Sequence, residues 1–193
     1  MLSPLARLLT LSSSPHRGTR VRFWLAALLL ALSLQGDRRN VCVLFADTRN
    51  FTLYSERHAP EEVVATTNRY LTAMADALFE HGGILDKFTG DGLMAFFLVE
   101  QAADSAGERM VVERAVRAAL AMRDAAERVS AELAAEGKEP LQIGLGVHYG
   151  PAVVGPVGSP RRPDYSALGH AVVVSHRLQG LAAGGEIVIS ETV

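Results

Sequence analysis

Two aspartates of the chain lie where a carboxylate could bind a cation. Asp47 comes directly after the apolar run "VLFA", and Asp91 stands between Gly90 and Gly92 in the segment "FTGDGLM". If the two segments are neighbouring strands, both carboxylates converge at one point. Mg²⁺ and Mn²⁺ prefer such oxygen ligands, and Mg²⁺ leaves its other positions to water and phosphates. The alternative is that Asp91 is an ordinary turn residue and Asp47 a helix N-cap.

The elements that must position these aspartates follow from the pattern of apolar residues. "NVCVLFAD" predicts a buried strand, and "GILDKF" and "GLMAFFLV" predict a hairpin around the turn "TGDG". The segment after Ala59 predicts a helix that begins at Pro60 and ends at Gly82 and Gly83. Its predicted core-facing stripe comprises Val63, Val64, Thr67, Tyr70, Leu71, Met74 and Leu78.

The second half of the chain repeats this mixture of helices and strands. An alanine-rich helix is predicted between Asp104 and Glu136, where Gly137 ends it. "LQIGLGVHYGPAVVG" predicts a glycine-interrupted strand, "DYSALGHAVVVSHRLQGLA" a strand end followed by a helix, and "GEIVIS" another strand. Helices packed on a mostly antiparallel sheet make an α+β fold, here a sandwich of ferredoxin-like type.

Composition excludes several classes of protein. The chain has 193 residues, of which 49% are hydrophobic and 21% charged, and this suits one globular domain. A net charge of -2 provides no basic field, so nucleic acid is not an expected partner. Cys42 is the single cysteine, so no disulfide framework can form within one chain and a reducing, cytoplasmic location is expected.

The amino end, residues 1–36, is predicted to be a basic and apolar leader. Its apolar stretch Phe23–Leu34 is shorter than the roughly 17 to 25 residues of a membrane span. The preceding arginines give it the pattern of a signal peptide, whereas Arg38 and Arg39 oppose translocation of the chain. A membrane-proximal helix, a misplaced start codon, a weak anchor and a non-native leader remain open, and with them membrane contact through residues 21–34.

Five blocks of sequence occur in an order that resembles the catalytic domain of class III nucleotide cyclases. They are "FADTRNFT", "KFTGDGLMAFF", "GLGVHYGPAVVGPVGS", "DYSALGHAVVVSHRL" and "GEIVIS". The resemblance covers residues 37–193, and five ordered blocks are far more specific than one motif. It implies a nucleotide cyclase fold whose final strands are missing here, since the family continues into a hairpin that brings a lysine or arginine to the triphosphate.

The resemblance also implies roles for individual residues. Asp47 and Asp91 would hold two Mg²⁺ or Mn²⁺ ions, with the backbone carbonyl of Thr48 as a further ligand. The ions would lower the pKa of the ribose 3′-hydroxyl and hold the triphosphate. The residues implied to line the substrate, besides those that read the base, are Thr48, Phe51, Thr52 and Gly90.

Three further residues match positions that the family uses on the nucleotide. Lys87 matches a lysine that contacts adenine N1, which is an acceptor in adenine and a donor in guanine. Ser166 matches a second base-reading residue; its hydroxyl can accept from the adenine amino group, although it can also donate to guanine. Arg177 matches the arginine that neutralises charge on the phosphate in the transition state. Without the motif, Lys87 and Arg177 would be ordinary surface residues.

The chain departs from the family at several positions. Val173 replaces an asparagine that positions the ribose, and loss of a comparable polar contact costs roughly 10²- to 10³-fold in rate. Asn50 replaces a glycine, and asparagine is the best substitute where φ is positive. Thr48 replaces an aliphatic residue and His170 a small polar or acidic one. His148 is expected to pack inside the fold rather than to bind metal.

The leading hypothesis is an adenylate cyclase that converts ATP to cyclic AMP and pyrophosphate in intracellular signal transduction. The family draws the metal-binding acids from one protomer and the base-reading and arginine residues from the other. Because both sets are present, a head-to-tail homodimer with two equivalent sites is expected. An inactive nucleotide-binding partner is the alternative, and a guanylate cyclase is a weaker one.

Overall fold

The apolar run before Asp47 forms the central strand of a sheet. The computed structural model describes residues 36–100, 103–159 and 161–193. Strand β1 (Asp37–Thr48) pairs antiparallel with β3 (Leu93–Leu98) on one side and with β4 (Ile143–Ser159) on the other. Residues 41–46 are all buried, which explains why this strand is continuously apolar instead of alternating.

The sheet continues on both sides of these three strands. β2 (Ile84–Phe88) pairs antiparallel with β3, and β5 (Arg162–Leu168) follows β4, so the order is β2-β3-β1-β4-β5. The short strand β6 (Ile187–Ile189) pairs parallel with β4. The prediction of a mostly antiparallel sheet is therefore confirmed. Residues 37–154 and 165–193 form one compact unit, and the site described below lies within it.

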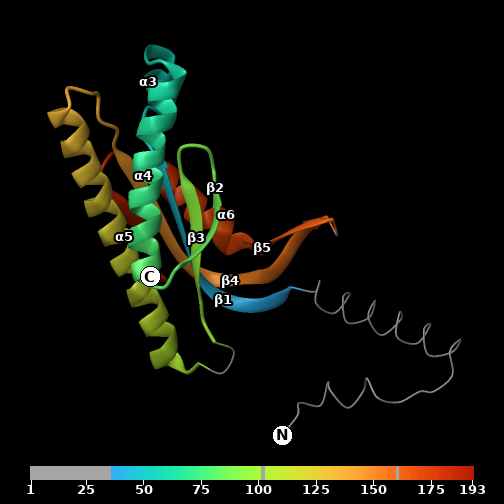
Figure 1. Ribbon diagram of the computed structural model, residues 1–193. Helices are drawn as coiled ribbons and strands as arrows, with labels where there is room; N and C mark the ends of the chain where they lie inside the picture. The colour runs from blue at the N-terminus through green and yellow to red at the C-terminus, as the bar shows by residue number, and fades with distance from the viewer. Residues whose placement is uncertain (1–35, 101–102, 160) are drawn as a thin grey trace, which may run out of the picture. The chain divides into compact units, whose positions relative to one another are not determined.

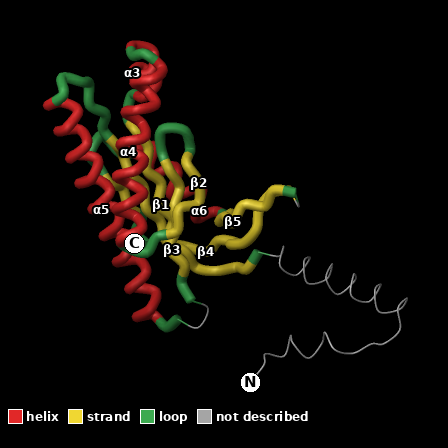
Figure 2. The backbone as a smooth tube through the Cα atoms, viewed as in Figure 1, coloured by secondary structure: helices red, strands yellow, loops and turns green. Residues whose placement is uncertain are grey.

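Helices lie on both faces of the sheet, as Figures 1 and 2 show. Helices α4 (Pro60–Glu80) and α5 (Ser105–Ala135) pack against each other and cover the face that bears Cys42, Leu44 and Ala46. Helix α6 (His170–Leu181) packs on β1 from the opposite face, which bears Val41, Val43 and Phe45. The predicted α+β sandwich is therefore confirmed.

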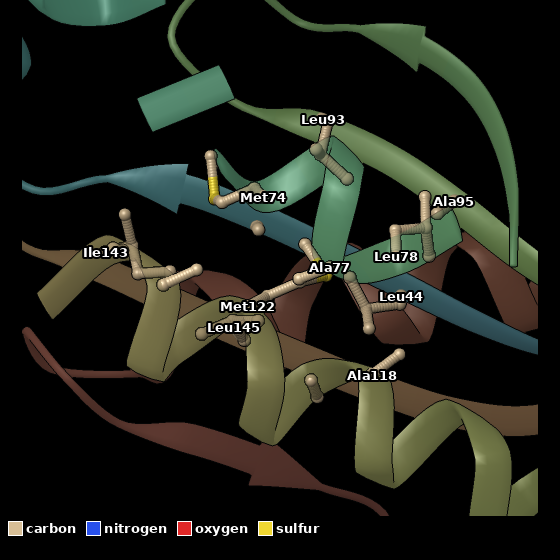
Figure 3. Close-up of a cluster of buried hydrophobic side chains, with 14 of the residues drawn as sticks. Leu44, Met74, Ala77, Leu78, Leu93, Ala95, Ala118, Met122, Ile143 and Leu145 are labelled. Carbon is tan, nitrogen blue, oxygen red and sulfur yellow. The ribbon is translucent and has the colours of Figure 1, made fainter. Parts of the chain in front are cut away.

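The larger core lies between the sheet and the helix pair α4 and α5 (Figure 3). Met74 and Leu78 from α4 and Met122 from α5 are fully buried against strand residues such as Leu44 and Leu145. Each such side chain contributes about 1.5–3 kcal/mol of hydrophobic stabilisation. The predicted stripe of α4 was wrong at Val64, which is 59% exposed because the helix turns this position away from the core.

The helix ends agree with the sequence signals. Pro60 is in the first turn of α4, and Gly82 follows its last turn with φ of 68°. Asp104 caps α5 by accepting a hydrogen bond from the Gly107 amide at 2.9 Å. A short helix, α3 (Phe51–Arg57), was not predicted, since seven residues carry little periodic signal.

Residues 1–35 of the predicted leader, including residues 21–34, lie outside the described residues. Among the helices that the structure describes, none is both long enough and apolar enough to cross a membrane.

Candidate active site

The carboxylates of Asp47 and Asp91 meet at one end of the sheet. Asp47 is the penultimate residue of β1, and Asp91 lies in the turn between β2 and β3, the neighbour of β1. Burial, followed by the negative charge of Asp91, raises the pKa of Asp47 to about 6. The convergence that the sequence predicted is therefore present, and burial together with the neighbouring carboxylate disfavours ionisation of Asp47.

The two glycines beside Asp91 are required for different structural reasons. A Cβ atom on Gly92 would lie 2.3 Å from the Ala46 carbonyl oxygen and 2.5 Å from Asp47 Oδ1, so only glycine lets β3 approach β1 this closely. Gly90 has open space around it, but its φ of 90° is a left-handed conformation that favours glycine. One glycine allows close packing and the other allows the turn.

Thr48 contributes a contact that sequence reasoning missed. Its side chain is buried, and its hydroxyl donates a hydrogen bond to Asp91 Oδ2. The strand that carries Asp47 thus also orients the second carboxylate. A family-typical aliphatic residue at this position could not make that bond, and the threonine-for-aliphatic difference was the available signal.

Two basic side chains moderate the negative charge at the site. Arg49 and His176 both lower the pKa of Asp47, against the effects of burial and Asp91. The Arg49 guanidinium donates to the backbone oxygens of Gln179 at 2.5 Å and Ala182 at 2.9 Å, at the carboxyl end of α6. These contacts fix Arg49 where the partial negative charge of the helix end favours a cation. Sequence reasoning assigned no role to either residue.

This donor set fits a hard divalent cation completed by other ligands. Two converging carboxylates, one of them with a pKa raised by burial and by its neighbour, are the kind of pair that Mg²⁺ or Mn²⁺ stabilises. Within the described ranges, no group of three or more His, Cys, Asp or Glu side chains could enclose a metal ion. Such a cation would therefore depend on water or on substrate phosphates for its remaining ligands.

A second polar group lies on β2 and β5. Lys87 Nζ lies 3.4 Å from the Ser166 hydroxyl oxygen, so the structure brings together the two predicted base-reading residues. Ser166 is only 1% exposed, and the side chain of Lys87 is 49% exposed. The neighbouring Asp86, which was not predicted, accepts a hydrogen bond from Ser166 at 2.5 Å.

Helix α6 presents the remaining predicted residue. Arg177 is exposed, and Val173 lies one turn before it on the same face with 48% exposure. Because about half of this side chain is exposed, the position that departs from the family is accessible to a ligand or a partner. Asn50, another departure, has φ of 60°, as expected where it replaces glycine.

The other predicted residues are placed as follows. Phe51 and Thr52 begin α3; Phe51 packs against the core and Thr52 is exposed. His148 is partly buried, and its Nδ1 lies 2.8 Å from the Ser190 hydroxyl, while burial and the charge of His170 lower its pKa. His148 thus packs within the fold, as expected.

The predicted residues form two separate groups in one chain. Asp47, Thr48 and Asp91 make one, and Lys87 and Ser166 make the other, and no described hydrogen bond or ion pair joins them. A groove of about 580 Å³ lies between α4 and α5, lined by residues such as Arg69 and Glu132. None of the predicted residues lines that groove, so it is unrelated to either group.

Comparisons with known proteins identify the family of the chain. The profile of a family described as "Adenylate and Guanylate cyclase catalytic domain" matches residues 35–193. The adenylate cyclase of Anabaena cylindrica is 34% identical over 161 residues, which are 80% of this chain and 30% of that protein. Adenylate cyclase 1 of Rhizobium meliloti (strain 1021) is 34% identical over 144 residues, which are 75% of this chain and 21% of that protein. The chain thus spans less than a third of the length of these relatives.

Solved structures agree with the sequence relatives. The guanylyl cyclase Cya2 is 37% identical with a TM-score of 0.74, covering 82% of this chain and 78% of that one. The adenylyl cyclase CyaB from P. aeruginosa is 33% identical with a TM-score of 0.75, covering 82% and 80%. With these relatives, and with a family profile that spans most of its length, the chain belongs to the class III nucleotide cyclases as one of their catalytic domains.

Proposed function

We propose that this domain is an adenylate cyclase, which forms 3′,5′-cyclic AMP and pyrophosphate from ATP. The observation that carries the proposal is the convergence of Asp47 and Asp91, where burial and then the charge of Asp91 raise the pKa of Asp47 to about 6. The relatives named adenylate cyclase from Anabaena cylindrica and Rhizobium meliloti support it.

Asp47 and Asp91 would hold two Mg²⁺ or Mn²⁺ ions, and Thr48 would hold Asp91 in position through its hydroxyl. Bound metal would supply charge neutralisation at the phosphates and a lower pKa for the ribose 3′-hydroxyl. In the reaction the 3′-oxygen gives its proton to solvent water and forms a bond to the α-phosphorus. The bond from that phosphorus to the bridging oxygen breaks, and pyrophosphate leaves.

Lys87 and Ser166 would read the purine, and the base would replace the long 3.4 Å contact between them. The ammonium group donates to adenine N1, and the hydroxyl accepts from the adenine amino group. Arg177, exposed on α6, would neutralise charge on the phosphates.

We further infer a head-to-tail homodimer. One chain holds the carboxylate pair and the Lys87–Ser166 pair as two separate groups. A symmetric dimer would bring the carboxylates of one protomer to the base-reading pair and Arg177 of its partner, and would generate two equivalent sites. A cytoplasmic location would supply ATP and Mg²⁺ to these sites.

The direct test is to assay the full chain for cyclic AMP formation from ATP with Mn²⁺. Asp91→Ala should abolish product, because one carboxylate cannot replace the pair. Asp76→Ala removes an exposed carboxylate from α4 and should retain full activity. Folded, dimeric protein that binds ATP with Mn²⁺ and forms no cyclic nucleotide would contradict the proposal.

Two observations favour alternatives. The guanylyl cyclase Cya2 is 37% identical, which makes GTP the competing substrate, and the assay should therefore include GTP. The exposed Val173, where the family carries a polar residue, favours a regulatory partner that binds nucleotide without turning it over.

A further inference from the structure

Asp86 is a buried carboxylate to which the mechanism above gives no role. Its side chain is 0% exposed although it lies on the edge strand β2. Its Oδ2 accepts the hydrogen bond from Ser166, and its Oδ1 lies 3.3 Å from Lys87 Nζ in an ion pair that lacks hydrogen-bond geometry. Burial of a carboxylate is costly unless its partners compensate, so this arrangement calls for an explanation.

An irregularity in β2 places the Asp86 side chain next to Ser166. The pairing of β2 with β3 shifts between Leu85, opposite Ala95, and Lys87, opposite Met94. In a regular strand, neighbouring side chains point to opposite faces. The extra residue of the bulge breaks this alternation, and both Asp86 and Lys87 contact Ser166 on β5.

The hydrogen bond to Asp86 determines what Ser166 can do. A serine hydroxyl has one proton and two lone pairs. Because the proton is donated to Asp86 at 2.5 Å, only lone pairs remain, and the 3.4 Å contact with Lys87 uses one of them. Towards a ligand, Ser166 can therefore only accept.

We propose that Asp86 is a positioning residue that makes Ser166 an obligate acceptor and thereby selects adenine over guanine. This inference rests on the proposed function, in which Lys87 and Ser166 face the Watson–Crick edge of the purine. Adenine presents an amino donor to Ser166 and an acceptor, N1, to Lys87. Guanine presents an oxygen acceptor and an N1 donor at the same places, so both contacts become repulsive.

The test is the ratio of kcat/KM for ATP to kcat/KM for GTP in the full chain. Asp86→Asn keeps the shape but frees the Ser166 proton, because the amide can present its NH₂ group to the hydroxyl oxygen. The ratio should fall about tenfold, the worth of one discriminating hydrogen bond, mainly through a higher KM for ATP. Ser130→Ala, which removes a hydroxyl of α5 that donates to the Leu141 backbone oxygen, should leave the ratio unchanged.

A double-mutant cycle separates positioning from structural damage. In a Ser166→Ala background, Asp86→Asn should change the ratio no further, because Asp86 acts through that hydroxyl. An equal fall in both backgrounds, or an unchanged ratio in the single variant, would overturn the inference. If Asp86→Asn does not fold, Asp86→Ser removes the same charge and carries the same expectation.

The inference and the proposed function can fail separately. If the wild-type chain forms no cyclic nucleotide, its affinities for ATP and GTP are measured by calorimetry with Ca²⁺. A preference for ATP that Asp86→Asn removes would support the inference while the activity fails. If the chain forms cyclic AMP and Asp86→Asn leaves the ratio of kcat/KM for ATP to that for GTP unchanged, the inference is wrong and the proposed activity stands.

Discussion

At the scale of single residues, Val173 departs from the family pattern, in which an asparagine at this position contacts the ribose. It lies one helical turn before Arg177 and is 48% exposed, so a polar residue would fit there without disturbing the core. We expect Val173→Asn to raise kcat by roughly 10²- to 10³-fold, the worth of a comparable polar transition-state contact. Val172→Asn, at the adjacent and partly buried position, is the control and should give no gain.

The outcome of that substitution distinguishes the two leading functions. A large gain would mean that the remaining site is competent and that valine limits it. No gain, in a variant that folds and binds ATP, would favour the regulatory partner. Steady-state kinetics with saturating Mn²⁺ measures the difference.

The pKa of Asp47 predicts how stability depends on pH and metal. The folded pKa of about 6 exceeds the ordinary value of 3.8, so between these values the folded state binds a proton that the unfolded state does not. This group therefore lowers the free energy of unfolding as pH rises from about 4 to 6, and the penalty persists above pH 6. Burial is the largest cause of this raised pKa, and the facing groups that modify it are Asp91, Arg49 and His176.

A cation should remove that penalty, whereas protonation opposes its binding. We expect Mn²⁺ to raise the Tm of the wild-type chain more at pH 7.5 than at pH 5. Asp47→Asn in EDTA should be more stable than wild type at pH 7.5 and should not respond to Mn²⁺. Thermal unfolding in both buffers tests this, and a variant less stable than wild type in EDTA at pH 7.5 would contradict it.

At the scale of elements, the turn between β2 and β3 depends on its two glycines for different reasons. Gly92→Ala would force a Cβ into the backbone of β1, 2.3 Å from the Ala46 carbonyl oxygen. We expect it to lower the free energy of unfolding by about 1–3 kcal/mol and to weaken Mn²⁺ binding, because Asp91 moves away from Asp47.

Gly90→Ala is the matched comparison. A Cβ there meets nothing within 4 Å, so only its left-handed φ of 90° imposes strain. It should cost about 1–2 kcal/mol of stability and leave the distance between the strands unchanged. Urea denaturation and Mn²⁺ titration of both variants provide the comparison. Equal loss of Mn²⁺ affinity in both would count against close strand packing as the reason for Gly92.

The elements also show how much of the fold could be predicted from the sequence. The strand before Asp47, the glycine turn and the two long helices carry strong local signals, and the structure agrees with them. The bulge at Asp86 and the hydroxyl bond of Thr48 could not be predicted, because both depend on the register between strands. Val64 was wrongly predicted to face the core. Helical spacing alone does not define how wide the buried face of the helix is.

At the scale of the whole molecule, the separation of the two polar groups predicts complementation between inactive chains. Asp91→Ala removes a carboxylate and Arg177→Ala removes the phosphate-binding residue, so each homodimer should be inactive. When the variants are co-expressed in equal amounts, half of the dimers are mixed and each contains one intact site. About a quarter of wild-type cyclic AMP formation should therefore return. No recovery in a mixture shown to contain mixed dimers would exclude the shared site.

The burial of Cys42 has a practical consequence for studying this sheet. It is the single cysteine of the chain, it is 0% exposed in the central strand, and burial raises its pKa to about 12. A thiol in that state does not react with alkylating reagents, so labelling requires that β1 first leave its neighbours. The rate at which Cys42 is alkylated therefore measures how often the sheet opens. The factor by which bound nucleotide slows alkylation measures how much the nucleotide stabilises the closed sheet.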